Sequence, residues 1–390
     1  MPSYGSAKPK IIFALFLVHF TGDFYSAFIT PLLPVLADKF ALTLTQVGLL
    51  AGLSRLLAFV VQPSVGYLAD RYQTRFFILG GPALAVVFIP LVGVASTFWL
   101  LLVLVALGSI GSSMFHPTAA GMVSTFSGSR VGLAMSIFSL GGTIGFGVGP
   151  LLATSFVSRF GLANLPYTMV LGLALMAVLI LIVPQPRGEG LKNLGFIGSL
   201  KAALGAVWKA ITLLWILVFI RTFVSQSFMT FLPLLYNQEG YSLVSIGVII
   251  SAYTVAAAMG GVLAGYLADR IGPKPVFVWS YLLASPCLYL FLYLPGQWVY
   301  LSAFLSGFIL LATMPLAVAM AQMMAPRGKA IVSSLMMGLA FGVGGMMTPL
   351  TGKLAEIFSI REVLTAVAVI PLLAVCLVFR LPDSKKVSAD

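Results

Sequence analysis

Long apolar runs alternate with short polar segments over the whole chain. Each run is close to or above the roughly 20 residues that a helix needs to cross the hydrocarbon core of a membrane. The period-two alternation of membrane β-strands is not seen. The pattern therefore predicts an all-α integral membrane protein with twelve transmembrane helices, at about 10–37, 44–69, 76–95, 98–124, 131–157, 163–183, 210–235, 243–268, 275–294, 298–324, 331–356 and 361–380.

Composition supports the same class. Of 390 residues, 60% are hydrophobic and 8% are charged, whereas a soluble domain is about 45–50% apolar and about 25% charged. The two cysteines, Cys287 and Cys376, both lie in apolar segments, which favours packing roles over a disulfide scaffold.

The net charge of +12 first suggests a nucleic-acid partner, but its distribution does not. With both termini cytoplasmic, the loops on that side carry sixteen Lys and Arg residues and the other loops carry four. This is the positive-inside pattern, which places both termini in the cytoplasm. We expect contact with anionic lipids and no nucleic-acid partner.

The chain contains an internal repeat. "GYLADRYQTR" begins at Gly66, and "GYLADRIGPK" begins at Gly265, 199 positions later. Parallel repeats of six helices characterise one transporter architecture. We expect a six-helix bundle over 1–183, a cytoplasmic linker with an interfacial helix over 184–209, and a second bundle over 210–390.

A polar stripe at helical spacing on the first predicted helix consists of His19, Asp23, Ser26 and Thr30. Ionisable groups within a span cost roughly 2.5–3.5 kcal/mol on insertion scales, so they usually face the bundle interior and have a function. Asp23 is the one acid that the predicted topology places deep within a span. We predict that Asp23 couples transport to protons with help from His19, with static packing as the alternative.

Depth along the helices suggests partners for this stripe. At about 1.5 Å per residue, Arg55 lies at nearly the depth of Asp23, and His116 lies near the depth of His19. Separating Asp23 from Arg55 would favour protonation of the carboxylate. The alternative is a fixed ion pair. The candidate substrate contacts are His116, Arg221, Tyr25, Ser26, Thr30, Phe115, Gln226, Tyr253 and Met314. The alternatives are that His116 hydrogen-bonds carbonyls freed by Pro117, that Arg221 points to a neighbouring helix, and that the aromatic residues and Met314 only pack in the core.

The two "GYLADR" segments resemble motif A of the major facilitator superfamily, and "GFGVGP" resembles the core of its antiporter motif C. The resemblance implies a conformational latch formed by Gly66, Asp70, Arg71, Arg75, Gly265, Asp269, Arg270 and Lys274. It also implies close helix packing at Gly145, Gly149 and Pro150. Simple turn anchoring and generic packing are the alternatives.

Within that superfamily the chain resembles the fosmidomycin resistance protein family of bacterial drug exporters. The resemblance rests on "GSSMFHP" (111–117), "GLAMSIFSLGGTIGFGVGPLLA" (132–153), "QPSVGYLAD" (62–70), "GLAFGVGG" (338–345) and "LPDSKK" (381–386). It implies that basic Arg221 contacts an anionic substrate. It departs at Thr118, where an acid often follows the His-Pro pair, so a relay through that position is in doubt.

These observations predict a monomeric secondary transporter that exports a small drug or metabolite in exchange for protons. The sequence has no Walker-type nucleotide loop, so we expect the proton gradient to supply the energy, with no cofactor and no metal. A facilitator or proton-linked importer on the same scaffold is one alternative. A membrane-embedded enzyme that uses His19, Asp23 and His116 is a remote one.

Overall fold

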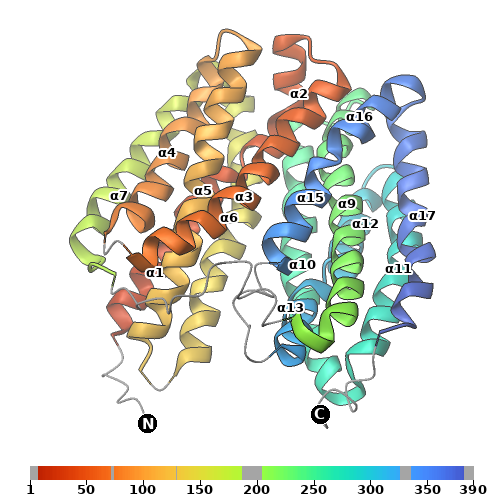
Figure 1. Cartoon of the computed structure of the whole chain (residues 1–390). Coiled ribbons are helices and arrows are strands. Elements are labelled where there is room, and N and C mark those ends of the chain that lie inside the picture. Colours follow the sequence, from red (N-terminus) through yellow and green to blue (C-terminus); the bar gives the residue numbers. More distant parts are fainter. Residues whose placement is uncertain (1–7, 72–73, 129, 187–203, 326–334, 382–390) are drawn as a thin grey trace. The chain divides into compact units, whose positions relative to one another are not determined.

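The computed structural model describes residues 8–71, 74–128, 130–186, 204–325 and 335–381 (Figure 1). Every regular element in these ranges is helical. Within them, 12 helices are long and apolar enough to cross a membrane. The predicted all-α fold with twelve spans is therefore confirmed.

The elements of the first six spans are α1 (Pro9–Ser26), α2 (Ile29–Phe40), α3 (Leu44–Arg71), η1 (Phe76–Gly80), α4 (Gly81–Leu91), η2 (Val92–Val94), α5 (Phe98–Phe126), α6 (Val131–Phe160), η3 (Leu162–Thr168) and α7 (Met169–Ile182). Those that follow are η4 (Gly205–Val207), α9 (Trp208–Gln238), α10 (Leu243–Ile271), α11 (Pro273–Tyr293), α12 (Trp298–Leu310), α13 (Thr313–Met324), η5 (Leu335–Ala340), α15 (Phe341–Met346), α16 (Thr348–Ile357) and α17 (Ile360–Val378).

Internal contacts divide the chain into two compact units. Unit 1 comprises residues 1–41, 60–192 and 242–247, and unit 2 comprises residues 42–59, 193–241 and 248–390. The first part of α3 thus belongs with unit 2, although it lies in the N-terminal half of the sequence. The predicted bundle boundaries stay a prediction, and most of the predicted linker helix falls on residues 187–203, outside the described ranges.

The first span is broken, which corrects the predicted polar stripe. Helix α1 ends at Ser26, two turn residues follow, and α2 begins at Ile29. Phe28 N donates to Tyr25 O, three residues back, at 3.1 Å, and Pro31 has no N–H to donate to Ala27 O, so the regular helical hydrogen bonds are interrupted across this turn. Thr30 therefore lies on a different helix from His19 and Asp23, so the stripe does not continue to it.

Within unit 1, α1 packs against α6 through glycines (Figure 1). A Cβ atom at Gly145 would lie 2.7 Å from the carbonyl oxygen of Phe20, and one at Gly149 would lie 2.6 Å from that of Phe24. Contacts this short with backbone atoms are relieved only by moving a helix. Glycine at these positions therefore sets how closely α1 and α6 approach.

Unit 2 has an apolar core to which α9, α11 and α13 contribute buried side chains such as Leu214, Phe277 and Ala317. Other large apolar side chains stay exposed on both units, among them Leu181 of unit 1 and Val262 of unit 2. Exposed apolar residues on helices of this length are those that lipid tails would cover. The arrangement is that of a membrane protein, with small and apolar residues inside and apolar residues outside.

We predict a large loss of stability for Gly260→Ala. A Cβ atom at this position of α10 would overlap the carbonyl oxygen of Phe308 on α12 and lie 2.9 Å from its carbonyl carbon. Overpacking of this kind costs about 1–3 kcal/mol, so the melting temperature of the purified protein should fall by several degrees. Gly265→Ala on the same helix, where a Cβ meets nothing within 4 Å, should be neutral. Equal melting temperatures for the two variants would contradict the packing.

Candidate functional site

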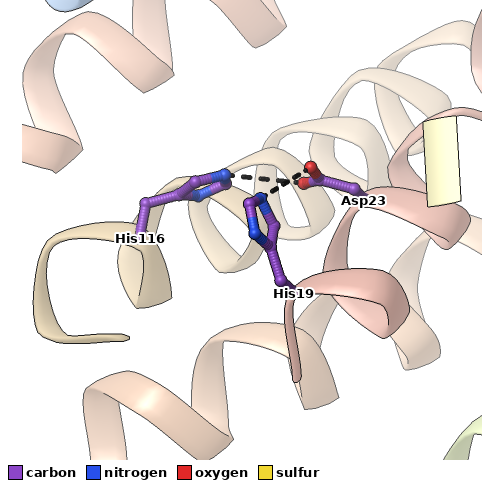
Figure 2. Close-up of side chains that lie close together, drawn as sticks. All are labelled: His19, Asp23 and His116. Carbon is purple, nitrogen blue, oxygen red and sulfur yellow. Dashed lines mark ion pairs between the residues drawn. The ribbon is translucent and has the colours of Figure 1, made fainter. Parts of the chain in front are cut away.

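Three ionisable side chains meet inside unit 1 (Figure 2). His19 and Asp23 lie one turn apart on α1, with His19 Nε2 3.1 Å from Asp23 Oδ2. His116 comes from α5, and its Nε2 lies 3.6 Å from Asp23 Oδ1. Asp23 is only 3% exposed. A carboxylate is therefore buried between two imidazole rings, as the depth argument for His19 and His116 implied.

Hydrogen bonds to the backbone determine which ring nitrogens carry hydrogen. His19 Nδ1 lies 2.8 Å from Phe138 O, and His116 Nδ1 lies 2.7 Å from Ser112 O. Carbonyl oxygens only accept, so each Nδ1 must donate. In a neutral ring the Nε2 atom that faces Asp23 then has a bare lone pair. The His19–Asp23 contact is thus attractive only when a proton sits on Nε2 or on the carboxyl group.

Aromatic rings and one glycine line the cluster, in which the His116 side chain stays 31% exposed. The His19 ring lies 4.2 Å from the Phe138 ring between centroids, and the His116 ring stacks on Phe115 at 4.1 Å. A Cβ atom at Gly142 of α6 would overlap His19 Nε2 and lie 2.7 Å from Asp23 Oδ2. Gly142 therefore leaves room for the His19–Asp23 pair.

The same three side chains are the candidates for a metal centre in the described residues. One ligand atom from each of His19, Asp23 and His116 lies within 4.8 Å of the others. A metal ion and a proton would compete for the same lone pairs. Asp23 Oδ1 has no hydrogen-bond partner among the described residues, so it is free to hold a proton or to coordinate a metal ion.

Arg55 belongs to unit 2, whereas Asp23 belongs to unit 1. Arg55 Nε donates to Gln226 Oε1 at 3.2 Å, and the guanidinium lies over the Phe341 ring at 4.9 Å. Gly345 leaves room for the Arg55 side chain, since a Cβ there would lie 2.6 Å from Arg55 Cβ. The predicted pairing of Arg55 with Asp23 stays a prediction.

Arg221 on α9 is 2% exposed and lies inside unit 2. Its Nη2 contacts Thr222 Oγ1 at 3.1 Å and Met314 Sδ at 3.0 Å, and its Nε has no partner among the described residues. Hydroxyl and thioether groups are weak acceptors compared with a carboxylate. The charge of Arg221 is therefore buried with little compensation.

Several other predicted substrate contacts are occupied by structural interactions. Tyr25 OH donates to Thr168 O at 2.6 Å, which ties α1 to η3. Tyr253 OH shares a 2.9 Å hydrogen bond with Ser225 Oγ, and the side chain is 1% exposed. These contacts favour packing roles in the observed conformation for Tyr25 and Tyr253.

The predicted latch residues lie at or near the ends of helices. Gly66, Asp70 and Arg71 fall in the last turns of α3. Arg75 Nη1 donates to Ile180 O at 3.1 Å, and Lys274 Nζ donates to Leu381 O at 3.0 Å. In the second copy, Arg270 stacks on the Tyr266 ring at 4.5 Å, while Gly265 has open space and Asp269 is exposed. The latch role stays a prediction.

Sequence reasoning missed Gly142 and the carbonyl oxygens that orient the two histidines. Gly141 and Gly142 stand side by side in "SLGGTIG", and both face α1, since a Cβ at Gly141 would overlap Phe16 O. That doubled glycine was a signal that another helix approaches α6 closely at this point. Backbone carbonyl acceptors leave no signal in a sequence.

Comparison with known proteins decides the family. The model of the Major Facilitator Superfamily matches residues 15–251 and 214–390. The chain belongs to the major facilitator superfamily. Fosmidomycin resistance protein from Escherichia coli (strain K12) is 31% identical over 382 residues, which cover 96% of this chain and 93% of that protein. The predicted resemblance is confirmed, and the chain is a multi-pass membrane protein and a secondary transporter.

Two further members of the superfamily match at lower identity. Multidrug resistance protein MdtG from Serratia proteamaculans (strain 568) is 28% identical, over 66% of this chain and 65% of that protein. A bacterial homologue of the human lysosomal transporter Spinster, in an inward-facing unoccupied conformation, superposes with a TM-score of 0.83 at 17% identity, covering 96% and 98% of the two chains. The family consists of transporters, which excludes the membrane-enzyme alternative.

Proposed function

We propose that this transporter exports small anionic compounds across the bacterial inner membrane in exchange for protons. In this proposal both termini lie in the cytoplasm, and the protein acts as a monomer. The names of its relatives support export, since they include a fosmidomycin resistance protein and a multidrug resistance protein. The compound would cross by alternating access, and phosphonates of the fosmidomycin kind are the first candidates.

One observation carries the proton coupling. Asp23 is buried between two imidazoles whose Nδ1 atoms donate to backbone carbonyls, so their Nε2 atoms face the carboxylate. With a proton bound, the group is held together by charge-assisted hydrogen bonds. Without one, bare lone pairs face a negative carboxylate, and α1 and α5 are pushed apart at this level. Proton binding and release would thus bias the conformation of unit 1.

A change in this cluster supplies a switch for alternating access. An equilibrium between two conformations shifts only by as much as the bound species differs in affinity for them. In the proposal the proton favours the conformation with Asp23 held by His19. Arg55 is the proposed partner of the deprotonated Asp23 in the other conformation, and the motif A residues act as the latch between conformations.

Transport by purified protein in liposomes tests the proposal. For one-for-one exchange with the membrane potential held at zero, a pH gradient stores about 1.4 kcal/mol per unit for each proton, so a lumen two units more acidic should concentrate the compound about a hundredfold inside. A proton ionophore should abolish the accumulation. Accumulation only with an acidic exterior would indicate an importer, and no effect of either gradient would indicate a facilitator.

A growth assay identifies the compound that is then used in the liposome experiment. Cells that lack or overproduce the transporter are exposed to a panel of small anions that includes fosmidomycin, together with matched neutral compounds. We expect overproduction to protect against one or more of the anions. Protection confined to neutral or cationic compounds would contradict the proposed substrate class.

A further inference from the structure

The buried guanidinium of Arg221 has no acidic partner in unit 2. The four acids of unit 2 that the structure describes, Glu239, Asp269, Glu356 and Glu362, are all exposed. None of the ion pairs among the described residues includes Arg221. A buried charge without a counter-charge is strongly unfavourable. The observation therefore raises the question of which anion completes this site.

The helix that contacts Arg221 is broken in the middle of its membrane span. The span Trp298–Met324 is divided where α12 ends at Leu310 and α13 begins at Thr313. Thr313 is 1% exposed, and its hydroxyl has no partner among the described residues. Met314, the second residue of α13, receives the Arg221 contact. A side chain in the first turn of this 12-residue helix, where the helix dipole favours negative charge, thus touches an uncompensated cation. Met314 N already donates to Leu311 O at 3.3 Å and Pro315 has no N–H, so the unpartnered Thr313 hydroxyl is the donor on which the argument rests.

We propose that Arg221 and the start of α13 form the binding site for the oxyanion of the transported compound, a carboxylate, phosphate or phosphonate. Discontinuous membrane helices commonly direct the N-terminus of a half-helix at an anionic substrate group. The guanidinium offers its unpartnered Nε and the Nη2 that now contacts Met314. Met314 is unbranched and flexible, so its thioether can be displaced by the anion.

This inference rests on the proposed function for the role of the site in transport. It assigns the proton and the anionic substrate to two different binding sites. The proton binds in unit 1 at Asp23, and the anion binds in unit 2 at Arg221. Binding of the anion requires no gradient. It can therefore be measured independently of coupled transport.

The test measures the binding of phenylphosphonate and benzoate to the purified full chain in detergent. Binding is measured by calorimetry and by thermal shift. We expect both anions to bind, and neutral benzyl alcohol to bind at least tenfold more weakly. Arg221→Gln should raise the dissociation constant at least tenfold, and Thr313→Val should raise it severalfold. Arg159→Gln, at an exposed position of α6, is the matched control and should bind as the wild type does. Unchanged anion binding by Arg221→Gln would overturn the proposal.

The melting temperature without ligand distinguishes a binding role from a structural one. If the Arg221 charge is reserved for an anion, Arg221→Gln removes an uncompensated buried charge, and the melting temperature stays equal or rises. A marked fall would show that the arginine holds the fold together and would contradict the assignment. Added phosphatidylglycerol separates a lipid headgroup from a soluble substrate. Stabilisation by the lipid but not by phenylphosphonate would overturn the substrate assignment.

Discussion

Asp23→Asn should abolish export against a gradient while the protein still folds. Asparagine has the shape of aspartate, and its amide N–H can donate to His19 Nε2, the atom that now lies 3.1 Å from the carboxylate. The variant therefore keeps a hydrogen bond at this place without binding a proton. The pair can no longer respond to pH, so the gradient can no longer bias the conformation.

The expected effect is a loss of at least tenfold in the accumulation ratio of proteoliposomes with an acidic lumen. Passive equilibration of the compound down its own gradient should persist, since the proposed anion site in unit 2 is intact. Asp38→Asn, an exposed carboxylate on α2, is the matched control and should transport as the wild type does. Vesicles of Asp23→Asn that still accumulate the compound would show that the coupling proton binds elsewhere.

The number of spans and the contact between His19 and His116 could both be predicted from the sequence. Apolar runs report burial in lipid directly, and depth along a helix follows from its rise per residue. Depth alone does not give rotation about the helix axis. It matched Asp23 with Arg55 and His19 with His116, and it did not predict the contact between Asp23 and His116. The structure describes the histidine contacts of Asp23, while Arg55 bonds to Gln226.

The local breaks within membrane helices could not be predicted from the sequence pattern. Hydrophobic periodicity averages over a span, so the turn after Ser26 and the break before Thr313 left no trace in it. Both breaks matter for function. The first removes Thr30 from the helix that carries Asp23, and the second places a helix start beside Arg221.

Gly142→Ala should disable transport without unfolding the protein. The added Cβ would overlap His19 Nε2 and lie 2.7 Å from Asp23 Oδ2, both of which are ends of side chains rather than backbone. The side chains can yield where a backbone cannot. The His19 ring must then turn away and lose either its 2.8 Å bond to Phe138 O or its contact with Asp23. We expect the accumulation ratio to fall at least tenfold, with the melting temperature nearly unchanged.

Two other glycines make this result specific to the proton site. Gly121→Ala on α5, where a Cβ meets nothing within 4 Å, should transport normally, because alanine is only a better helix former there. Gly145→Ala meets the α1 backbone, with its Cβ 2.7 Å from Phe20 O and 2.9 Å from Phe24 N, so it should lower the melting temperature. A transport-competent Gly142→Ala would mean that the His19–Asp23 geometry is irrelevant to coupling. Loss of stability equal to that of Gly145→Ala would mean that Gly142 serves helix packing alone. Only the loss of transport in a stable protein assigns this glycine of the motif C helix to the proton site.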